Sequence, residues 1–150
     1  MERYLKVIII LICIIFIGFV IYSLNDSKEI REVCFNNSCY KVEVSKTSQE
    51  RSRGLMFREY LKEENGMLFI FSEEGKYGFW MKNTYIPLDI IWISQNNEVV
   101  QTIENIQPCK IDDCLSYGGH ENALYVLEVN SGEIEKNNIK IGDEVEFKYS

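Results

Sequence analysis

The stretch FWMKNTYIPLDIIWI, residues 79–93, decides the fold because it is a dense apolar run that polar residues interrupt. Burying an unpaired amide or charge costs about 2–7 kcal/mol or more, so a strand built only for a core would exclude Lys82 and Asn83. Pro87 has no amide hydrogen to give to a central ladder and belongs at a strand start. The stretch therefore predicts two strands joined by a polar turn, with Asp89 the one polar residue that needs a buried partner.

Apolar segments on both sides of this stretch predict further strands, because they alternate or run continuously between turn residues. They cover residues 41–47, 67–71, 96–106, 123–130 and 141–149. Thr47 and Glu50 have the spacing of a capping box, which predicts a short helix from Ser48 to near Gly54, and residues 131–138 suit one helical turn. About seven strands with one clear helix predict an all-β, mostly antiparallel sandwich or small barrel rather than βαβ units.

Residues 7–24 carry no charge, and as a helix they would extend about 27 Å, close to the thickness of a hydrocarbon core. Arg3 and Lys6 precede them, so the positive-inside rule predicts a cytoplasmic N-terminus and an extracytoplasmic domain on a single-pass cell-membrane protein. A cleaved signal peptide is the alternative, although no small-residue cleavage site closes the run. The predicted organisation is a membrane anchor over residues 1–25, a stalk and hairpin over 26–39, and a β domain over 40–150.

Four cysteines beyond the predicted anchor form two pairs of equal spacing, Cys34 with Cys39 and Cys109 with Cys114. Asn36 and Asn37 suit a two-residue hairpin turn, which would place Cys34 opposite Cys39 within reach of a disulfide. Cys109, Cys114 and His120 could instead be three zinc ligands, but structural zinc sites usually have closer cysteines and a fourth ligand. We predict two local disulfides and no metal.

Charge and motifs limit the partners. Residues 26–150 contain 14 Lys and Arg against 22 Asp and Glu, a formal charge of 14 − 22 = −8, which disfavours nucleic acid. No glycine-rich phosphate-binding loop is present in the sequence, so no cofactor is predicted.

Several motifs together resemble the family called domain of unknown function 192. They are GLMFR at 54–58, GMLFIF at 66–71, FWMKNTYIPLDIIWI at 79–93, VLEVNSG at 126–132 and IKIGDEV at 139–145. The resemblance implies a compact, mostly β domain with a short helix, in a family whose members are often secreted or membrane-tethered. It implies no activity, since none is established for the family.

Two carboxylates lie inside strongly apolar strands, Asp89 and Glu128. If they faced one cleft, they could act as the acid and base of a hydrolase working on a polysaccharide or envelope component. They could equally be structural, accepting hydrogen bonds from the backbone or pairing with a cation. The sequence alone does not establish whether they share a face.

A cationic group near the predicted helix is the other candidate site, because guanidinium groups bind carboxylates through charge-assisted hydrogen bonds. The predicted ligand-binding residues are Arg51, Arg58, Lys82, Asn83 and Asp89. The arginines could instead neutralise acidic residues within the fold. The sequence favours a small binding or structural module that takes an anionic or carbohydrate ligand, with the hydrolase and a membrane-complex subunit as alternatives.

Overall fold

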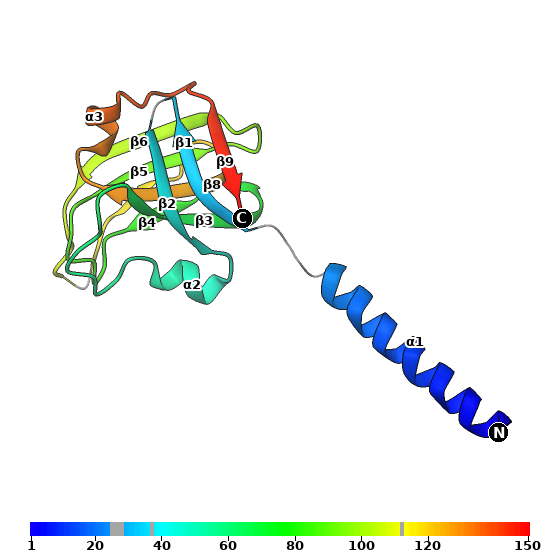
Figure 1. Cartoon of the computed structure of the whole chain (residues 1–150). Helices are drawn as coiled ribbons and strands as arrows, with labels where there is room; N and C mark the ends of the chain where they lie inside the picture. The colour runs from blue at the N-terminus through cyan, green and yellow to red at the C-terminus, as the bar shows by residue number, and fades with distance from the viewer. Residues whose placement is uncertain (25–28, 37, 112) are drawn as a thin grey trace.

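A computed structural model describes residues 1–24, 29–36, 38–111 and 113–150, with backbone only at residues 5 and 19–24 (Figure 1). Part of the predicted stalk, Asn37 of the predicted turn and Asp112 lie outside the described residues. The chain begins with helix α1 (Glu2–Leu24) and continues into a mostly β domain. The predicted all-β class with short helices is confirmed for that domain.

Within the described residues, a seven-stranded sheet has the order β6-β5-β8-β3-β2-β1-β9. Its strands are β1 (Ile30–Phe35), β2 (Ser38–Ser45), β3 (Asn65–Gly75), β5 (Leu88–Ile93), β6 (Val99–Ile106), β8 (Ala123–Asn130) and β9 (Val145–Tyr149). Neighbours are antiparallel except β2 and β3, which run parallel and are connected through helix α2 (Ser48–Arg53). Strands β4 (Gly78–Trp80) and β7 (Ser116–Gly118) form a separate two-stranded sheet, and helix α3 (Glu133–Asn137) precedes β9.

The seven-stranded sheet curls so that its two ends approach each other. The Val99 amide donates to the Asp143 carbonyl at 2.9 Å, and the Val145 amide donates to the Asn97 carbonyl at 2.8 Å. In Figure 1, β1, β2 and β9 accordingly cross in front of β5, β6 and β8. The domain is therefore a strongly curled sheet that is bridged at one end, close to the predicted small barrel.

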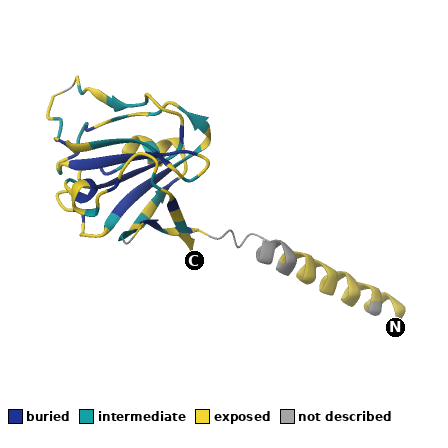
Figure 2. Cartoon of the chain, turned by 90° about the horizontal axis from the view of Figure 1, so that it is seen from above, coloured by how far each residue is buried: buried dark blue, intermediate teal, exposed yellow. Residues whose placement is uncertain are grey.

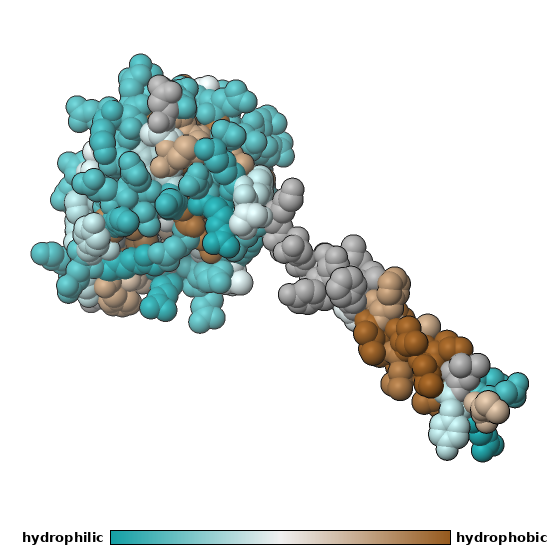
Figure 3. Space-filling model, in the orientation of Figure 1, coloured by the Kyte–Doolittle hydropathy of each residue, from teal (hydrophilic) through white to brown (hydrophobic). Residues whose placement is uncertain are grey.

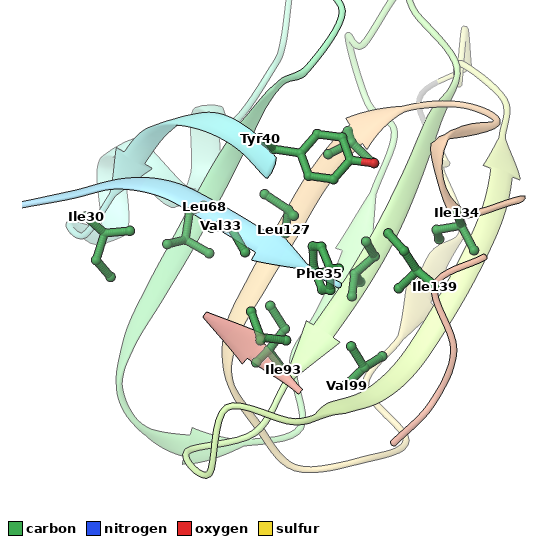
Figure 4. Close-up of a cluster of buried hydrophobic side chains, with 13 residues drawn as sticks. Ile30, Val33, Phe35, Tyr40, Leu68, Ile93, Val99, Leu127, Ile134 and Ile139 are labelled. Atoms are coloured by element: carbon green, nitrogen blue, oxygen red, sulfur yellow. The ribbon is translucent and has the colours of Figure 1, made fainter. Parts of the chain in front are cut away.

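Two apolar clusters lie on opposite faces of this sheet, because neighbouring residues of a strand point to opposite faces. The cluster inside the curl contains Val33, Phe35, Leu68 and Leu127 (Figure 4). The other contains Phe69, Met81, Trp92 and Val126 and is covered by the segments after α2 and around β4. The central strands are accordingly the most deeply buried (Figure 2). The face of the β domain seen in Figure 3 is largely hydrophilic, whereas much of α1 is hydrophobic.

The structure corrects the predicted membrane anchor. Among the described residues, no helix is both long enough and apolar enough to cross a membrane. The predicted single-pass location, with residues 7–24 in the membrane and an extracytoplasmic domain, is therefore not supported.

Both predicted disulfides are present. Strands β1 and β2 pair with Phe35 opposite Ser38 and Cys34 opposite Cys39, the register that the turn at Asn36 predicted. Cys109 and Cys114 are joined by the second disulfide. Zinc binding by this second pair with His120 would require reduction of the bond first, because thiolates are the zinc ligands.

Candidate functional site

The polar part of residues 79–93 forms a turn that packs against the segment after α2. Asn83 has a φ of 56°, a left-handed conformation that asparagine tolerates, and its carbonyl accepts a hydrogen bond from the Phe57 amide at 2.7 Å. Thr84 is buried, and its amide donates to the Met81 carbonyl at 3.2 Å. Asn83, a predicted ligand-binding residue, thus connects two segments through its backbone.

Asp89 has the buried partners that the sequence required. Its side chain is fully buried and accepts hydrogen bonds from three backbone amides, those of Asn105 at 2.7 Å, Gly132 at 3.0 Å and Ile134 at 2.9 Å. The three donors lie in β6, in the turn before α3 and at the start of α3. Asp89 therefore fastens α3 to the sheet, and the structure does not bring it together with the predicted ligand-binding cations.

Asp89 and Glu128 lie on opposite faces of the sheet. Between β5 and β8, Asp89 is opposite Val129 and Ile90 is opposite Glu128. Residues that are paired across two strands point to the same face, whereas consecutive residues point to opposite faces. The acid–base pair of the hydrolase hypothesis is therefore not formed.

Glu128 lies in a row of residues that crosses the outer face of the sheet, where Glu43 is opposite Met67 and Met67 is opposite Glu128. Arg58 donates to both carboxylate oxygens of Glu43, at 2.5 and 2.6 Å, and these bonds hold the pKa of Glu43 below its ordinary value. Arg58 is thus engaged in an ion pair, which is the structural alternative that the sequence left open.

Glu128 is only 5% exposed, and its Oε2 atom has no hydrogen-bond partner among the described residues. Burial raises the pKa of Glu128 to about 8, and the positive charge of Arg58 opposes this shift. A buried polar atom without a partner costs about 1–3 kcal/mol, so such atoms are rare in folded proteins. Among the described residues, Glu128 is the ionisable group with a buried, unpartnered side-chain atom, and the Ser45 hydroxyl is the other buried polar group without a partner.

A cavity of about 20 Å³ adjoins Glu128. Its walls include Gly54, Leu55, Phe69, Thr84 and Glu128. A Cβ atom at Gly54 would lie 3.3 Å from the Phe69 ring and 3.8 Å from Glu128 Oε2, and Gly54 has a φ of 47° that favours glycine. The glycine that ends α2 therefore keeps this space open.

A groove of about 390 Å³ lies next to this cavity, between α2 and β4. This α2–β4 groove is lined by Ser48, Arg51, Ser52, Phe71, Lys76, Tyr77, Gly78, Phe79 and Trp80. Four of these residues also line the cavity: Arg51, Ser52, Phe79 and Trp80. The groove and the cavity are therefore neighbours that share a wall.

One of the predicted cations, Arg51, lines this groove, and another, Lys82, lies over the groove residue Trp80. The Arg51 guanidinium lies 4.9 Å from the centre of the Phe71 ring, and its Nη1 donates to the carbonyls of Lys46 and Ile70. The Lys82 ammonium lies 5.8 Å from the centre of the Trp80 ring, and Trp80 is 49% exposed. The structure thus places Arg51 against Phe71 and Lys82 against Trp80, two aromatic rings of the groove lining.

Gly54, Thr84 and Trp80 are residues of this site that the predicted ligand-binding set omitted. Gly54 lies at the predicted end of the capped helix, and Thr84 belongs to the predicted polar turn. Both residues therefore lie in segments for which the sequence made a prediction. That they meet at Glu128 depends on how β3 and β8 pair, and a single sequence does not show which strands pair.

The described geometry can be compared with known proteins. The model of the family domain of unknown function 192, described as "Uncharacterized ACR", matches residues 31–147. No curated protein matches the chain.

The crystal structures that are similar to this chain include those of two bacterial proteins. One is a protein of unknown function from Novosphingobium aromaticivorans DSM 12444, at 34% identity and a TM-score of 0.72, covering 81% of this chain and 88% of that one. The other is described as a "putative transcription regulator" from Sinorhizobium meliloti 1021, at 31% identity and a TM-score of 0.70, covering 81% of this chain and 94% of that one. The family match, which extends over most of the β domain, agrees with the motifs in residues 54–145, and the chain belongs to the domain of unknown function 192 family.

Proposed function

We propose that the β domain is a binding module for a small acidic carbohydrate, which it holds in the α2–β4 groove. The observation that carries this proposal is the half-exposed Trp80 ring at the groove, with Lys82 beside it and Arg51 in the groove wall. A volume of about 390 Å³ falls in the range of small-molecule sites, about 300–1,000 Å³.

The chemistry of the lining favours a ligand with an apolar ring face and a negative charge. A flat indole gives a sugar ring a large apolar contact surface. Arg51 uses Nη1 for its two hydrogen bonds to carbonyls of the described chain, which leaves Nε and Nη2 as donors for a carboxylate. Lys76 and Lys82 add positive charge locally to a protein whose formal net charge is −7.

One of the similar crystal structures is described as a "putative transcription regulator", and this description applies to that protein. This chain has a formal net charge of −7, which disfavours binding to the negatively charged phosphate backbone of a nucleic acid. We therefore do not extend that description to this protein.

Titration of the full chain with glucuronate, a hexuronic acid, tests the proposal, with binding followed by amide chemical shifts. Trp80→Ala and Lys82→Ala should each weaken binding at least tenfold. The unfolding free energy should stay within about 1 kcal/mol of the wild type, because neither side chain is buried. Lys140→Ala, a change of an exposed lysine outside the groove lining, is the matched control and should bind as the wild type does.

Glucuronate that leaves the amide signals of α2 and β4 unmoved would contradict the proposal. Binding that survives both groove substitutions would place the ligand elsewhere and would contradict it equally. A large loss of stability in the two variants would indicate that Trp80 and Lys82 serve the fold rather than the ligand.

A further inference from the structure

Ligand binding in the α2–β4 groove does not explain why Glu128 is buried with one carboxylate oxygen that has no hydrogen-bond partner among the described residues. The neighbouring strand positions in its row are Met67 and Ile90, so an apolar side chain at 128 would match its surroundings. Instead, the fold keeps a carboxyl group there and opens a cavity beside it with a glycine. A polar group kept where packing favours an apolar one points to a ligand that completes its hydrogen bonding.

The size of the cavity selects the chemical group that could enter. A space of about 20 Å³ holds one water molecule or one hydroxyl oxygen, whereas a carboxylate or a sugar ring needs more room. A hydroxyl group both donates and accepts hydrogen bonds, so it suits a carboxyl group in either protonation state. The cavity also shares Phe79 and Trp80 with the α2–β4 groove, so a ring stacked on Trp80 lies beside it.

We propose that this cavity is a subsite for a single hydroxyl group of the ligand, and that Glu128 is the residue that binds that hydroxyl. The identity of the rest of the ligand rests on the function proposed above, but the subsite does not. The burial of Glu128 serves recognition, because a ligand without a hydroxyl at this position would leave the carboxyl oxygen unpaired. Glu128 thereby makes the site selective for polyhydroxylated ligands over simple aromatic or aliphatic acids.

Methanol, the smallest alcohol, is the probe that tests the subsite alone. In the full chain, methanol should shift the amide signals of Gly54, Leu55 and Thr84 and the carboxyl ¹³C signal of Glu128. Glu128→Gln keeps the hydrogen-bonding atoms and should retain the response. Glu128→Met fills the same volume without a polar atom, so methanol should bind at least fivefold more weakly while stability is unchanged or higher.

Glu133→Gln is the matched control. Glu133 is also buried, but its carboxylate already accepts hydrogen bonds from Tyr40, Lys136 and Asn137. That change should lower stability and leave the methanol response as it is in the wild type. A Glu128 carboxyl signal that methanol does not move in the wild-type chain would overturn the subsite, whether or not the variants fold.

The two proposals fail in different ways. If glucuronate binds through Trp80 but Glu128→Met binds it as tightly as the wild type does, the subsite is overturned and the binding function stands. If methanol reaches Glu128 as described but no uronate binds, the subsite stands and the function proposed for the groove is overturned.

Discussion

Asp89 and Glu128 show how the same functional group can serve stability in one place and a site in another. Asp89 receives three backbone amide hydrogens, so its burial is compensated and it fastens α3 to β5 and β6. Glu128 is nearly as buried but keeps an oxygen without a partner among the described residues, beside a small cavity. The hydrogen-bond partners, rather than the depth of burial, separate the structural carboxylate from the functional candidate.

The raised pKa of Glu128 makes a prediction about stability and pH. The folded-state pKa of about 8 lies above the ordinary value of 4.5, so between these values the folded chain binds more protons than the unfolded chain. Stability from this group must then fall as pH rises, by up to about 1.4 kcal/mol per pH unit, and level off above pH 8. Glu128→Gln, which does not titrate, should remove this decline.

Urea denaturation at pH 5, 6.5 and 8.5 measures this effect as the difference between wild type and variant. As the pH rises, the unfolding free energy of the wild type should fall relative to that of Glu128→Gln. Glu135→Gln, a change of an exposed carboxylate on α3, should follow the wild type at all three values. A gap that stays constant with pH would mean that Glu128 is ionised throughout the range.

At the scale of elements, local patterns predicted what depends on neighbours in sequence. The strand at residues 88–93, the capping box at Thr47 and the hairpin that joins Cys34 to Cys39 are all present, because each depends on residues within a few positions. The pairing of strands that are distant in sequence was harder to predict. The parallel pairing of β2 and β3 was not predicted, since α2 is too short to suggest a crossover.

The residues 79–81 illustrate the same limit. Their apolar character predicted a strand, and β4 is one, but it pairs with β7 outside the main sheet. Composition does not tell which sheet a short strand joins. Asp89 was predicted to be the one polar residue of this stretch that needs burial, and that was wrong for Thr84 in the polar turn, which is buried because the segment after α2 folds over the turn.

Helix α2 carries Arg51 to the groove, so its N-terminal cap should influence both stability and binding. The Thr47 side chain accepts a hydrogen bond from the amide at the third helical position, and loss of such a cap costs about 1 kcal/mol. Thr47→Ala should therefore lower the unfolding free energy by about that amount and weaken glucuronate binding modestly through a less ordered Arg51.

Chemical denaturation and the glucuronate titration check this prediction together. Gln49→Ala, a change of an exposed residue in the first turn of the same helix and outside the groove lining, is the control, because the cap hydrogen bond is made by Thr47. Full stability in Thr47→Ala would show that contacts of the helix with the sheet, rather than its cap, hold α2 in place.

Over the whole domain, one sheet supplies the walls of both apolar clusters, and this arrangement decides which candidate residues meet. Leu127 points into one cluster and Val126 into the other, so their neighbour Glu128 faces the side that α2 and β4 cover. The sequence predicted Arg51 and Lys82 as binding residues from their charge and from their places on the capped helix and in the polar turn. It did not separate them from Arg58 and Asp89, because that separation follows from strand register and sheet curvature.

Both clusters pack on the same strands, β3, β5 and β8. Neither cluster can therefore stay folded when that sheet unfolds, and the domain should unfold in a single transition. Two probes in urea test this in a Trp80→Phe background, where Trp92 is the one remaining tryptophan: the fluorescence of buried Trp92 for the outer cluster and a methyl signal of Val33 for the inner one. Their midpoints should coincide, and Leu127→Ala should shift both equally, by about 2–5 kcal/mol in unfolding free energy. An earlier midpoint for Trp92 alone would mean that the cover formed by α2 and β4 opens independently of the sheet, and the candidate site would then lie in a separately unfolding part of the molecule.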